Sequence, residues 1–156
     1  MSTKYIIPTP QSVSALLAMI FGDGVDTKDR EAPELDGQHV ATFVDDDDQL
    51  VALCVCDKEF VAYSGAALSM IPADVANEMI SGNSISEAML GNFYEVMNIC
   101  SKLLMSDTSA HLRLDKTLSP QESAEPLSAL KDSAQVIGFD IDIPKYGKGM
   151  LTFLVT

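Results

Sequence analysis

Basic residues are scarce in this sequence of 156 residues, which has 10 lysines and arginines against 23 aspartates and glutamates. The formal net charge is −13 at pH 7. Nucleic acids and anionic lipids carry negative charge themselves and would repel such a chain. The sequence also has no basic patch with interleaved aromatic residues. We therefore exclude nucleic-acid and membrane-surface binding, whereas a basic protein partner remains compatible with the charge.

Cysteine is also rare, and the three cysteines, Cys54, Cys56 and Cys100, all lie in apolar runs. An odd number in such surroundings argues against a disulfide framework and favours a reducing compartment. Cys54 and Cys56 share one face of a predicted strand, where we expect them to be buried as small hydrophobic residues. Neither histidine is close to a cysteine in sequence, so no zinc pattern is present. We predict no metal site and no cofactor of the protein's own.

Long apolar runs are missing as well. No segment reaches about 18 consecutive apolar residues, the length that suggests a membrane span. The first residues, MSTKYIIPTPQS, lack the apolar run of a signal peptide, so we expect a cytoplasmic protein. Hydrophobic residues still make up 47% of the chain, enough for residues 1–156 to form one globular domain with its own core.

The spacing of apolar residues predicts both helices and strands. Residues 10–21 have helical spacing after a start signal at Thr9 and Pro10. Residues 38–45 and 49–57 are predicted strands, and the second is apolar enough to lie at the centre of a sheet. The other predicted elements are a loop or exposed edge segment at 26–37, helices at 58–71, 73–81 and 84–105, a strand at 109–117, a short helix within 118–131, and strands at 133–143 and 148–155. Together they predict an α+β fold, a largely antiparallel sheet covered by helices, with a possible internal duplication of helix and strands.

The helix predicted at 84–105 carries the most informative residues. Ser84 and Glu87 match a capping box, which predicts the start of the helix. Its apolar stripe consists of Met89, Phe93, Val96, Cys100, Leu103 and Leu104. A second stripe, nearly opposite, consists of Gly91, Glu95, Asn98 and Lys102. A carboxylate and a carboxamide side by side can receive a cation and position a water, so Glu95 and Asn98 are the candidate site residues.

The simpler interpretation is that Glu95 and Asn98 only form the hydrated face of an amphipathic helix, because E-x-x-N is common by chance. Gly91 bears on this, since a glycine inside a helix costs about 1 kcal/mol relative to alanine. A close backbone approach at Gly91 would explain that cost, and so would sequence drift at a position that tolerates glycine. An unrelated α+β domain with a chance E-x-x-N predicts that Glu95 or Asn98 is buried in the fold.

This helix and the proline that follows it resemble the CheC/CheX/FliY family of chemotaxis phosphatases. The family pattern is Asp or Ser, three residues, Glu, two residues, Asn, about twenty-two residues, and Pro. In this sequence the corresponding residues are Gly91, Glu95, Asn98 and Pro120. Glu95 and Asn98 match the pattern, Gly91 replaces the Asp or Ser, and Pro120 comes one residue early. The order of elements is similar over nearly the whole chain. The helix at 10–21 has no Glu or Asn, so the motif occurs only once in this chain. In having a single motif, the chain is most similar to CheX.

The resemblance implies a function and a role for each residue of the motif. The implied substrate is the aspartyl phosphate of a phosphorylated CheY-like response regulator, which would also hold the Mg²⁺. Glu95 would pair with the regulator's lysine, and Asn98 would orient the attacking water. Gly91 and Lys102 would lie on the partner-binding face, and glycine at position 91 implies weaker docking or a different choice of partner.

Two further questions stay open at the level of sequence. The alternative function is a non-catalytic adaptor that binds a receiver domain or another signalling partner through the helix at 84–106. The resemblance to CheX also implies a possible homodimer with a sheet continuous across two subunits. The final strand, GMLTFLVT, could be the edge that pairs in such a dimer, or it could lie at the centre of the sheet.

Other polar residues have simpler explanations. The four aspartates at 45–48 are typical of a solvated turn, because the ligand spacing of an EF-hand is absent. His39 and His111 are expected to be packed or surface residues of strands. Ser64 lacks the surroundings of a nucleophile elbow. Residues 144–149 predict a hairpin loop and no phosphate-binding loop.

Overall fold

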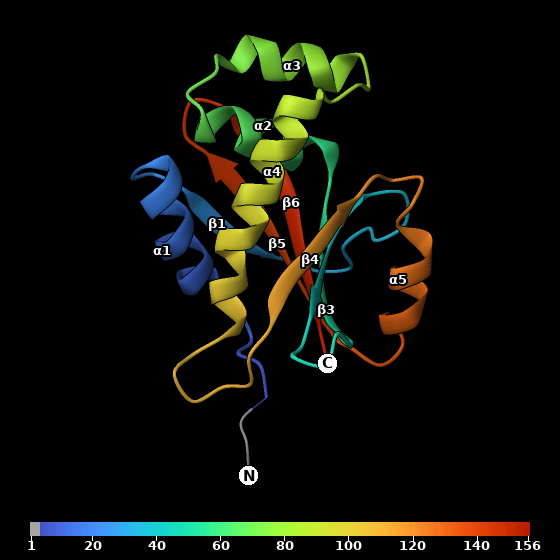
Figure 1. Ribbon diagram of the computed structural model, residues 1–156. Helices are drawn as coiled ribbons and strands as arrows, with labels where there is room; N and C mark the ends of the chain where they lie inside the picture. The colour runs from blue at the N-terminus through green and yellow to red at the C-terminus, as the bar shows by residue number, and fades with distance from the viewer. Residues whose placement is uncertain (1–3) are drawn as a thin grey trace.

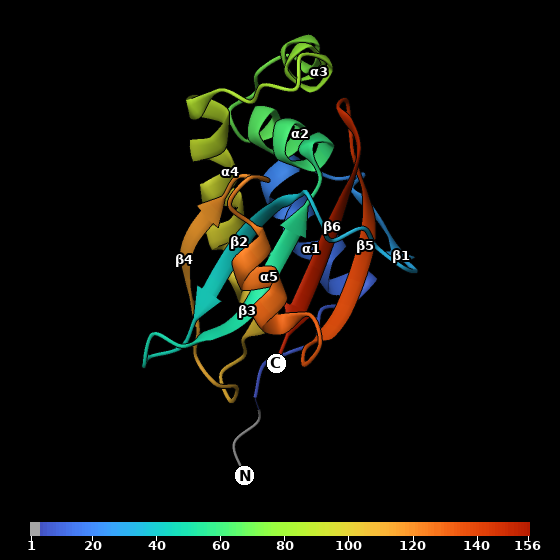
Figure 2. The same cartoon turned by 90° about the vertical axis from the view of Figure 1, so that its right-hand side faces the viewer.

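The computed structural model describes residues 4–156, which form a six-stranded sheet with helices on both faces (Figure 1). The helices are α1 (Pro10–Phe21), α2 (Lys58–Leu68), α3 (Ala73–Ser81), α4 (Glu87–Cys100) and α5 (Ala124–Leu130), with a 3₁₀ turn, η1 (Ser101–Leu104), after α4. The strands are β1 (Asp26–Arg30), β2 (His39–Val44), β3 (Leu50–Cys56), β4 (Arg113–Leu118), β5 (Gln135–Ile143) and β6 (Gly147–Val155). Helices α1, α2 and α4 cover one face of the sheet and α5 covers the other (Figure 2). The predicted α+β fold is confirmed.

The strands follow the order β1-β5-β6-β3-β2-β4, and every neighbouring pair is antiparallel. The apolar strand β3 lies at the centre, as its composition predicted. Strand β6 contains the segment GMLTFLVT apart from its last residue, Thr156, and pairs with β5 on one side and β3 on the other. It therefore has no free edge, and the expectation that it could join a second subunit's sheet is wrong. The two edges of the sheet are β1 and β4.

The strand order has the two-fold pattern expected of a duplicated fold. Each strand of the first half has a partner in the second half: β1 corresponds to β4, β2 to β5 and β3 to β6. When each strand is replaced by its partner, the strand order read from the opposite edge of the sheet is unchanged. The central pair of this arrangement is β3 and β6, one from each half. Helix α1 precedes the first strand of one half, and α4 precedes the first strand of the other. The topology thus makes α1 and α4 counterparts, and both lie on the same face of the sheet (Figure 1).

The starts of the two counterpart helices are set by side-chain caps. Thr9 caps α1, since its hydroxyl accepts a hydrogen bond from the backbone N–H of Ser12 at 3.1 Å. The predicted cap of α4 at Ser84 is wrong. The backbone N–H of Ser84 donates to Met79 O at 3.0 Å, which joins this residue to the end of α3. Ser86 is the N-cap, and its hydroxyl accepts from the N–H of Met89 at 3.3 Å.

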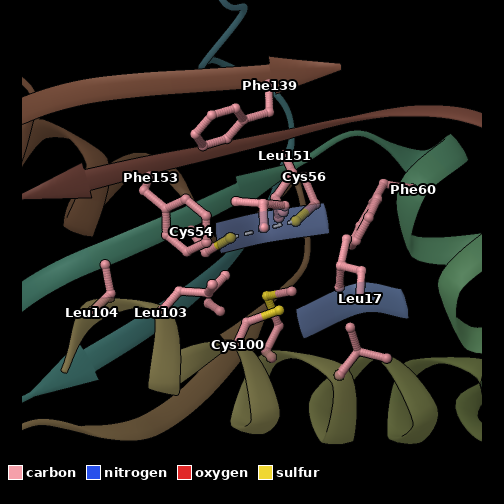
Figure 3. Packing of buried hydrophobic residues seen from close by; sticks show 14 of the residues in the cluster. Leu17, Cys54, Cys56, Phe60, Cys100, Leu103, Leu104, Phe139, Leu151 and Phe153 are labelled. Carbon is pink, nitrogen blue, oxygen red and sulfur yellow. Dashed lines mark hydrogen bonds between the residues drawn. The ribbon is translucent and has the colours of Figure 1, made fainter. Parts of the chain in front are cut away.

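The main core lies between the sheet and helices α1, α2 and α4 (Figure 3). Cys54 and Cys56 point into it from β3 with their sulfur atoms 3.8 Å apart, and Cys100 enters it from α4. All three cysteines are free and fully buried, so their prediction as core residues is confirmed. Burial raises the pKa of the Cys56 and Cys100 thiols well above its ordinary value. Both thiols therefore stay protonated.

Helix α2 packs unusually close to its neighbours because glycines face it at two contacts. A Cβ on Gly149 of β6 would lie 2.6 Å from the backbone N and Cα of Phe60. A Cβ on Gly147 would lie 2.8 Å from the ring of Tyr63. On the other side of α2, a Cβ on its own Gly65 would lie 3.0 Å from Met89 O of α4. Because glycine has no side chain at these positions, α2 can pack close to β6 on one side and close to α4 on the other.

Gly149→Ala is therefore expected to destabilise the protein by about 2–3 kcal/mol, because the added methyl group meets backbone that cannot move aside cheaply. Urea unfolding followed by circular dichroism measures this change. The same substitution at Gly91, where nothing lies within 4 Å of an added Cβ, is the control. A Gly149→Ala protein as stable as the wild type would mean that α2 and β6 are not in such close contact.

Candidate functional site

Helix α4 turns one face to the core and the other to solvent. Its inner face is the predicted apolar stripe, which continues into η1 and is buried throughout. Met97 is buried with it, although the predicted stripe did not include this residue. The exposed residues of α4 and η1 are Glu87, Ala88, Gly91, Tyr94, Glu95, Asn98 and Lys102. The predicted polar stripe is therefore a continuous surface, here called the α4 outer face.

Glu95 and Asn98 are neighbours on the α4 outer face. Side chains three residues apart on a helix have Cβ atoms about 5–6 Å from each other. Both residues are exposed, so the burial of Glu95 or Asn98 that a chance E-x-x-N in an unrelated domain predicts is not found. Among residues 4–156, neither side chain makes a hydrogen bond or an ion pair. A carboxylate and an amide thus stand side by side, free to bind groups from outside the chain.

A different amide, that of Asn92, fixes α4 to the rest of the protein. Its Nδ2 donates hydrogen bonds to Gly65 O at 2.9 Å and to the hydroxyl of Ser69 at 2.8 Å, both at the contact with α2. The sequence prediction missed this residue. A signal was available in α2, where Gly65 inside the helix indicates a close approach of another segment. Asn92 is therefore a structural amide, whereas the Asn98 side chain makes no hydrogen bond within the part of the chain that the structure describes.

The other two residues predicted to bind a partner are also on the surface. Nothing lies within 4 Å of the position that a Cβ on Gly91 would take, so no close backbone approach within the described chain explains this glycine. Lys102 is exposed in η1, one helical turn beyond Asn98. Its amine has no acidic partner within salt-bridge distance among residues 4–156. Tyr94, 37% exposed, adds an aromatic ring to the same surface.

Pro120, the last residue of the sequence pattern, lies elsewhere. It lines a hollow of about 390 Å³ together with His39 and Asn83, and the lining includes no residue of α4. The rings of His39 and Phe93 pack in a T-shaped arrangement with their centroids 6.3 Å apart. His39 is buried, so its prediction as a packed strand residue is confirmed. The structure thus brings Glu95 and Asn98 together but does not add Pro120 to their surface.

The aspartates at 45–48 form a turn, as predicted. The Asp45 carboxylate accepts hydrogen bonds from the backbone N–H groups of Asp47 and Gln49, at 2.9 and 3.0 Å. Asp46 contacts His111 and Asp48 pairs with Arg113, so the run is tied to the start of β4. No group of three or more His, Cys, Asp or Glu residues within the described part of the chain could hold a metal ion. None of its helices is both long and apolar enough to cross a membrane.

Comparisons with known proteins identify the fold. No protein-family model matches the sequence, and no curated protein matches it either. FliM from H. pylori, in the crystal structure of a FliM–SpeE complex, is 12% identical and has a TM-score of 0.63 over 94% of this chain and 80% of that chain. FliY from Thermotoga maritima is 15% identical, with a TM-score of 0.63 over 93% of this chain and 82% of that chain. CheX from Desulfovibrio desulfuricans is 11% identical, with a TM-score of 0.43 over 94% of this chain and 95% of that chain.

Identities this low establish the fold and nothing finer. The chain has the fold of FliY and of the FliM middle domain, which agrees with the resemblance of the sequence to the CheC/CheX/FliY family. The superposition on CheX carries no argument for the closer likeness to CheX that the single motif suggested. The function and the roles of Glu95 and Asn98 therefore depend on the chemistry of the α4 outer face.

Gly91→Ala is expected to stabilise the protein by about 1 kcal/mol, because alanine has the higher helix propensity and the added methyl group meets nothing. Thermal and urea unfolding measure the change. A loss of stability would contradict the open surroundings of Gly91 and would indicate that part of the chain packs against it.

The stability of the protein is expected to fall as the pH drops below about 6.5, the pKa of an unperturbed histidine. Burial lowers the pKa of His39 in the folded protein. The unfolded chain therefore takes up a proton at a higher pH than the folded chain, and stability is lost down to the folded pKa. Urea unfolding between about pH 7 and pH 5 should show a weaker pH dependence for His39→Gln. The surface substitution His111→Gln is the control, and equal pH dependence in wild type and His39→Gln would contradict the prediction.

Proposed function

We propose that the protein is a phosphatase that hydrolyses the aspartyl phosphate of a CheY-like response regulator, with Asn98 and Glu95 as its functional residues. The observation that carries this proposal is an exposed carboxylate and amide on the α4 outer face, neither of which has a hydrogen-bond or ion-pair partner among residues 4–156. The likeness of the fold to FliY supports it, as does the single Glu-x-x-Asn motif that resembles CheX. The substrate is a group on another protein's surface, so the site needs a docking face and no deep pocket.

The proposed reaction needs little chemistry from this chain. An oxygen of water attacks phosphorus, the bond between phosphorus and the aspartyl oxygen breaks, and the regulator's carboxylate leaves with the bonding electrons. The proton lost by the water passes to the phosphate product or to solvent. Asn98 would hold the water in line with the breaking bond, because an amide both donates and accepts hydrogen bonds without titrating. The Mg²⁺ of the regulator supplies positive charge at the phosphoryl oxygens.

The remaining residues of the α4 outer face suit docking. Glu95 would pair with a lysine of the regulator and set the position of Asn98 over the phosphoryl group. Lys102, which has no acidic partner within salt-bridge distance among residues 4–156, lies one turn beyond Asn98 and would attract the regulator's anionic site. Gly91 leaves an uncovered stretch of helix backbone one turn before Glu95. A partner can approach closely there, which gives this glycine an external reason that the fold itself does not supply.

A non-catalytic adaptor is the second candidate, and two observations favour it. Glycine replaces the Asp or Ser with which the family's motif begins, so one polar contact to the partner is missing. FliM, which has the same fold, forms a complex with another protein, SpeE. In this alternative the α4 outer face binds a receiver domain or another signalling protein, and Asn98 has no substrate to act on.

Phosphate release from a panel of phosphorylated CheY-like receiver domains with Mg²⁺ tests the proposal. The wild type should accelerate release over autodephosphorylation for at least one receiver. Asn98→Ala should lose at least about 100-fold of that acceleration, in line with the loss of a positioned water, with binding to the receiver retained. Glu95→Ala should mainly weaken binding and raise KM, with a smaller effect on kcat.

The variants need a control for folding, since α4 also packs against α2. Urea unfolding of Asn98→Ala and Glu95→Ala checks that both variants fold. Glu78→Gln changes an exposed residue of α3, outside the α4 outer face, and it should leave both stability and hydrolysis unchanged. Full activity of Asn98→Ala would contradict the enzymatic proposal. Binding of a receiver that is lost in Glu95→Ala, without acceleration by any protein in the series, would favour the adaptor.

A further inference from the structure

The hollow that contains Pro120 lies at one end of the sheet, where segments distant in sequence meet. Strand β2 begins there beside the ends of β3 and β4, and α2 starts directly after β3 (Figure 2). The loop between α3 and α4 adds Asn83 to the lining. With a volume of about 390 Å³, the hollow has the size of a small-molecule site. Within the described chain no residue of α4 lines it, so the hollow is separate from the α4 outer face.

The imidazole of His39 is a buried polar group in the lining of this hollow. His39 is 8% exposed, and its ring packs against Phe93, which has no conventional hydrogen-bonding group. Among residues 4–156, neither ring nitrogen of His39 makes a hydrogen bond. Burial lowers the pKa of His39, so the ring is neutral near pH 7 and offers one donor and one acceptor. Because buried polar groups nearly always have hydrogen-bond partners, these two nitrogens point to a ligand in the hollow.

Charged side chains of both signs line the same hollow without forming ion pairs. Glu34, Lys58 and Glu59 have no partner within salt-bridge distance among residues 4–156. One carboxylate oxygen of Glu59, Oε2, is buried and has no hydrogen-bond partner in that part of the chain. A buried carboxylate oxygen without a partner carries a desolvation cost that nothing offsets. The fold therefore leaves both anionic and cationic groups of the hollow without a use of its own.

The other two charged residues of the lining already serve the fold. The guanidinium of Arg30 donates a hydrogen bond to the carboxylate of Asp140 at 2.7 Å. The carboxylate of Asp57 accepts hydrogen bonds from the backbone N–H groups of Phe60 and Met150, at 2.8 and 3.0 Å. Arg30 and Asp57 are thus held in place at the start of α2, and the groups that remain for a ligand are those of Glu34, Lys58, Glu59 and His39.

This combination of charges favours a ligand that itself carries both signs. A ligand with negative charge alone would be repelled by the carboxylates of Glu34 and Glu59, and a ligand with positive charge alone would be repelled by the ammonium group of Lys58. A small zwitterion can place each of its charges beside the opposite charge of the protein. Ion pairs of this kind are also hydrogen bonds between charged groups, which are stronger than those between neutral groups.

We propose that this hollow binds a free amino acid. The ammonium group of the ligand donates to the carboxylates of Glu59 and Glu34, and its carboxylate accepts from the ammonium group of Lys58. The neutral ring of His39 hydrogen-bonds to the ligand, which gives the buried nitrogens the partner that the chain does not provide. The exposed amide of Asn83 lies at the rim, where it can contact the side chain of the ligand.

Isothermal titration calorimetry of the full chain with each of the common amino acids tests this site. At least one amino acid should give saturable binding. Ethanolamine has the ammonium group without the carboxylate, and acetate has the carboxylate without the ammonium group. Both should bind at least about tenfold more weakly than that amino acid, because each satisfies only one sign of charge in the hollow.

Two substitutions locate the site. Glu59→Gln keeps the shape of the side chain and removes its charge, and His39→Phe keeps an aromatic ring against Phe93 and removes the ring nitrogens. Each should weaken binding by at least about tenfold. Glu125→Gln is the matched control, since Glu125 is likewise an acidic residue in the first turn of a helix but lies outside this hollow. Circular dichroism checks that the variants are folded, and Glu59→Gln alone decides the location if His39→Phe does not fold.

The proposal would be overturned if no amino acid bound to the wild type. Ethanolamine or acetate binding as tightly as the best amino acid would also overturn it, because the two charges would then not be recognised together. Unchanged affinity in Glu59→Gln would place the bound amino acid elsewhere on the protein. None of these measurements depends on the hydrolysis of a phosphorylated receiver domain.

Discussion

The close approach of helix α2 to strand β6 and to helix α4 is the contact on which the rest of the fold depends. Gly149 leaves room for the backbone of Phe60 at the start of α2, and Gly65 leaves room for the backbone of α4 at Met89. Asn92 then closes the contact with two hydrogen bonds to α2. Because α2 is held on one side by the sheet and holds α4 on the other, it sets the rotation of α4 about its axis. That rotation decides which residues of α4 reach solvent.

Much of this arrangement could be predicted from periodicity. The apolar spacing identified both α1 and α4 as helices and identified the buried face of α4, and the apolar run of β3 placed this strand at the centre of the sheet. The position of β6 could not be decided in the same way. Its apolar composition suits a central strand and a strand that pairs with a second subunit equally well, and only the partners of both its edges distinguish them.

The remaining errors and omissions come from contacts between segments distant in sequence. Ser84 and Ser86 are equally good cap residues by type, but the backbone of Ser84 is bonded to the end of α3, which leaves Ser86 to cap α4. Gly91 and Gly149 are alike as letters in the sequence. Gly91 faces open space and Gly149 faces the backbone of α2. Replacement by alanine is therefore expected to raise the stability of the protein at Gly91 and to lower it at Gly149. The structural role of Asn92 likewise depends on where α2 passes.

The residues of the proposed site are those that the fold does not need. Glu95, Asn98 and Lys102 make no polar side-chain contact within the described chain, so folding places no demand on their chemistry beyond a preference for polar groups. Gly91 is actively unfavourable, because a helical glycine costs about 1 kcal/mol and nothing packed against it offsets that cost. In α1, the counterpart position in the duplicated topology, the fold accepts Ala15 and Met19 on the surface without difficulty. The scaffold thus permits either an uncharged or a polar outer face on these two helices.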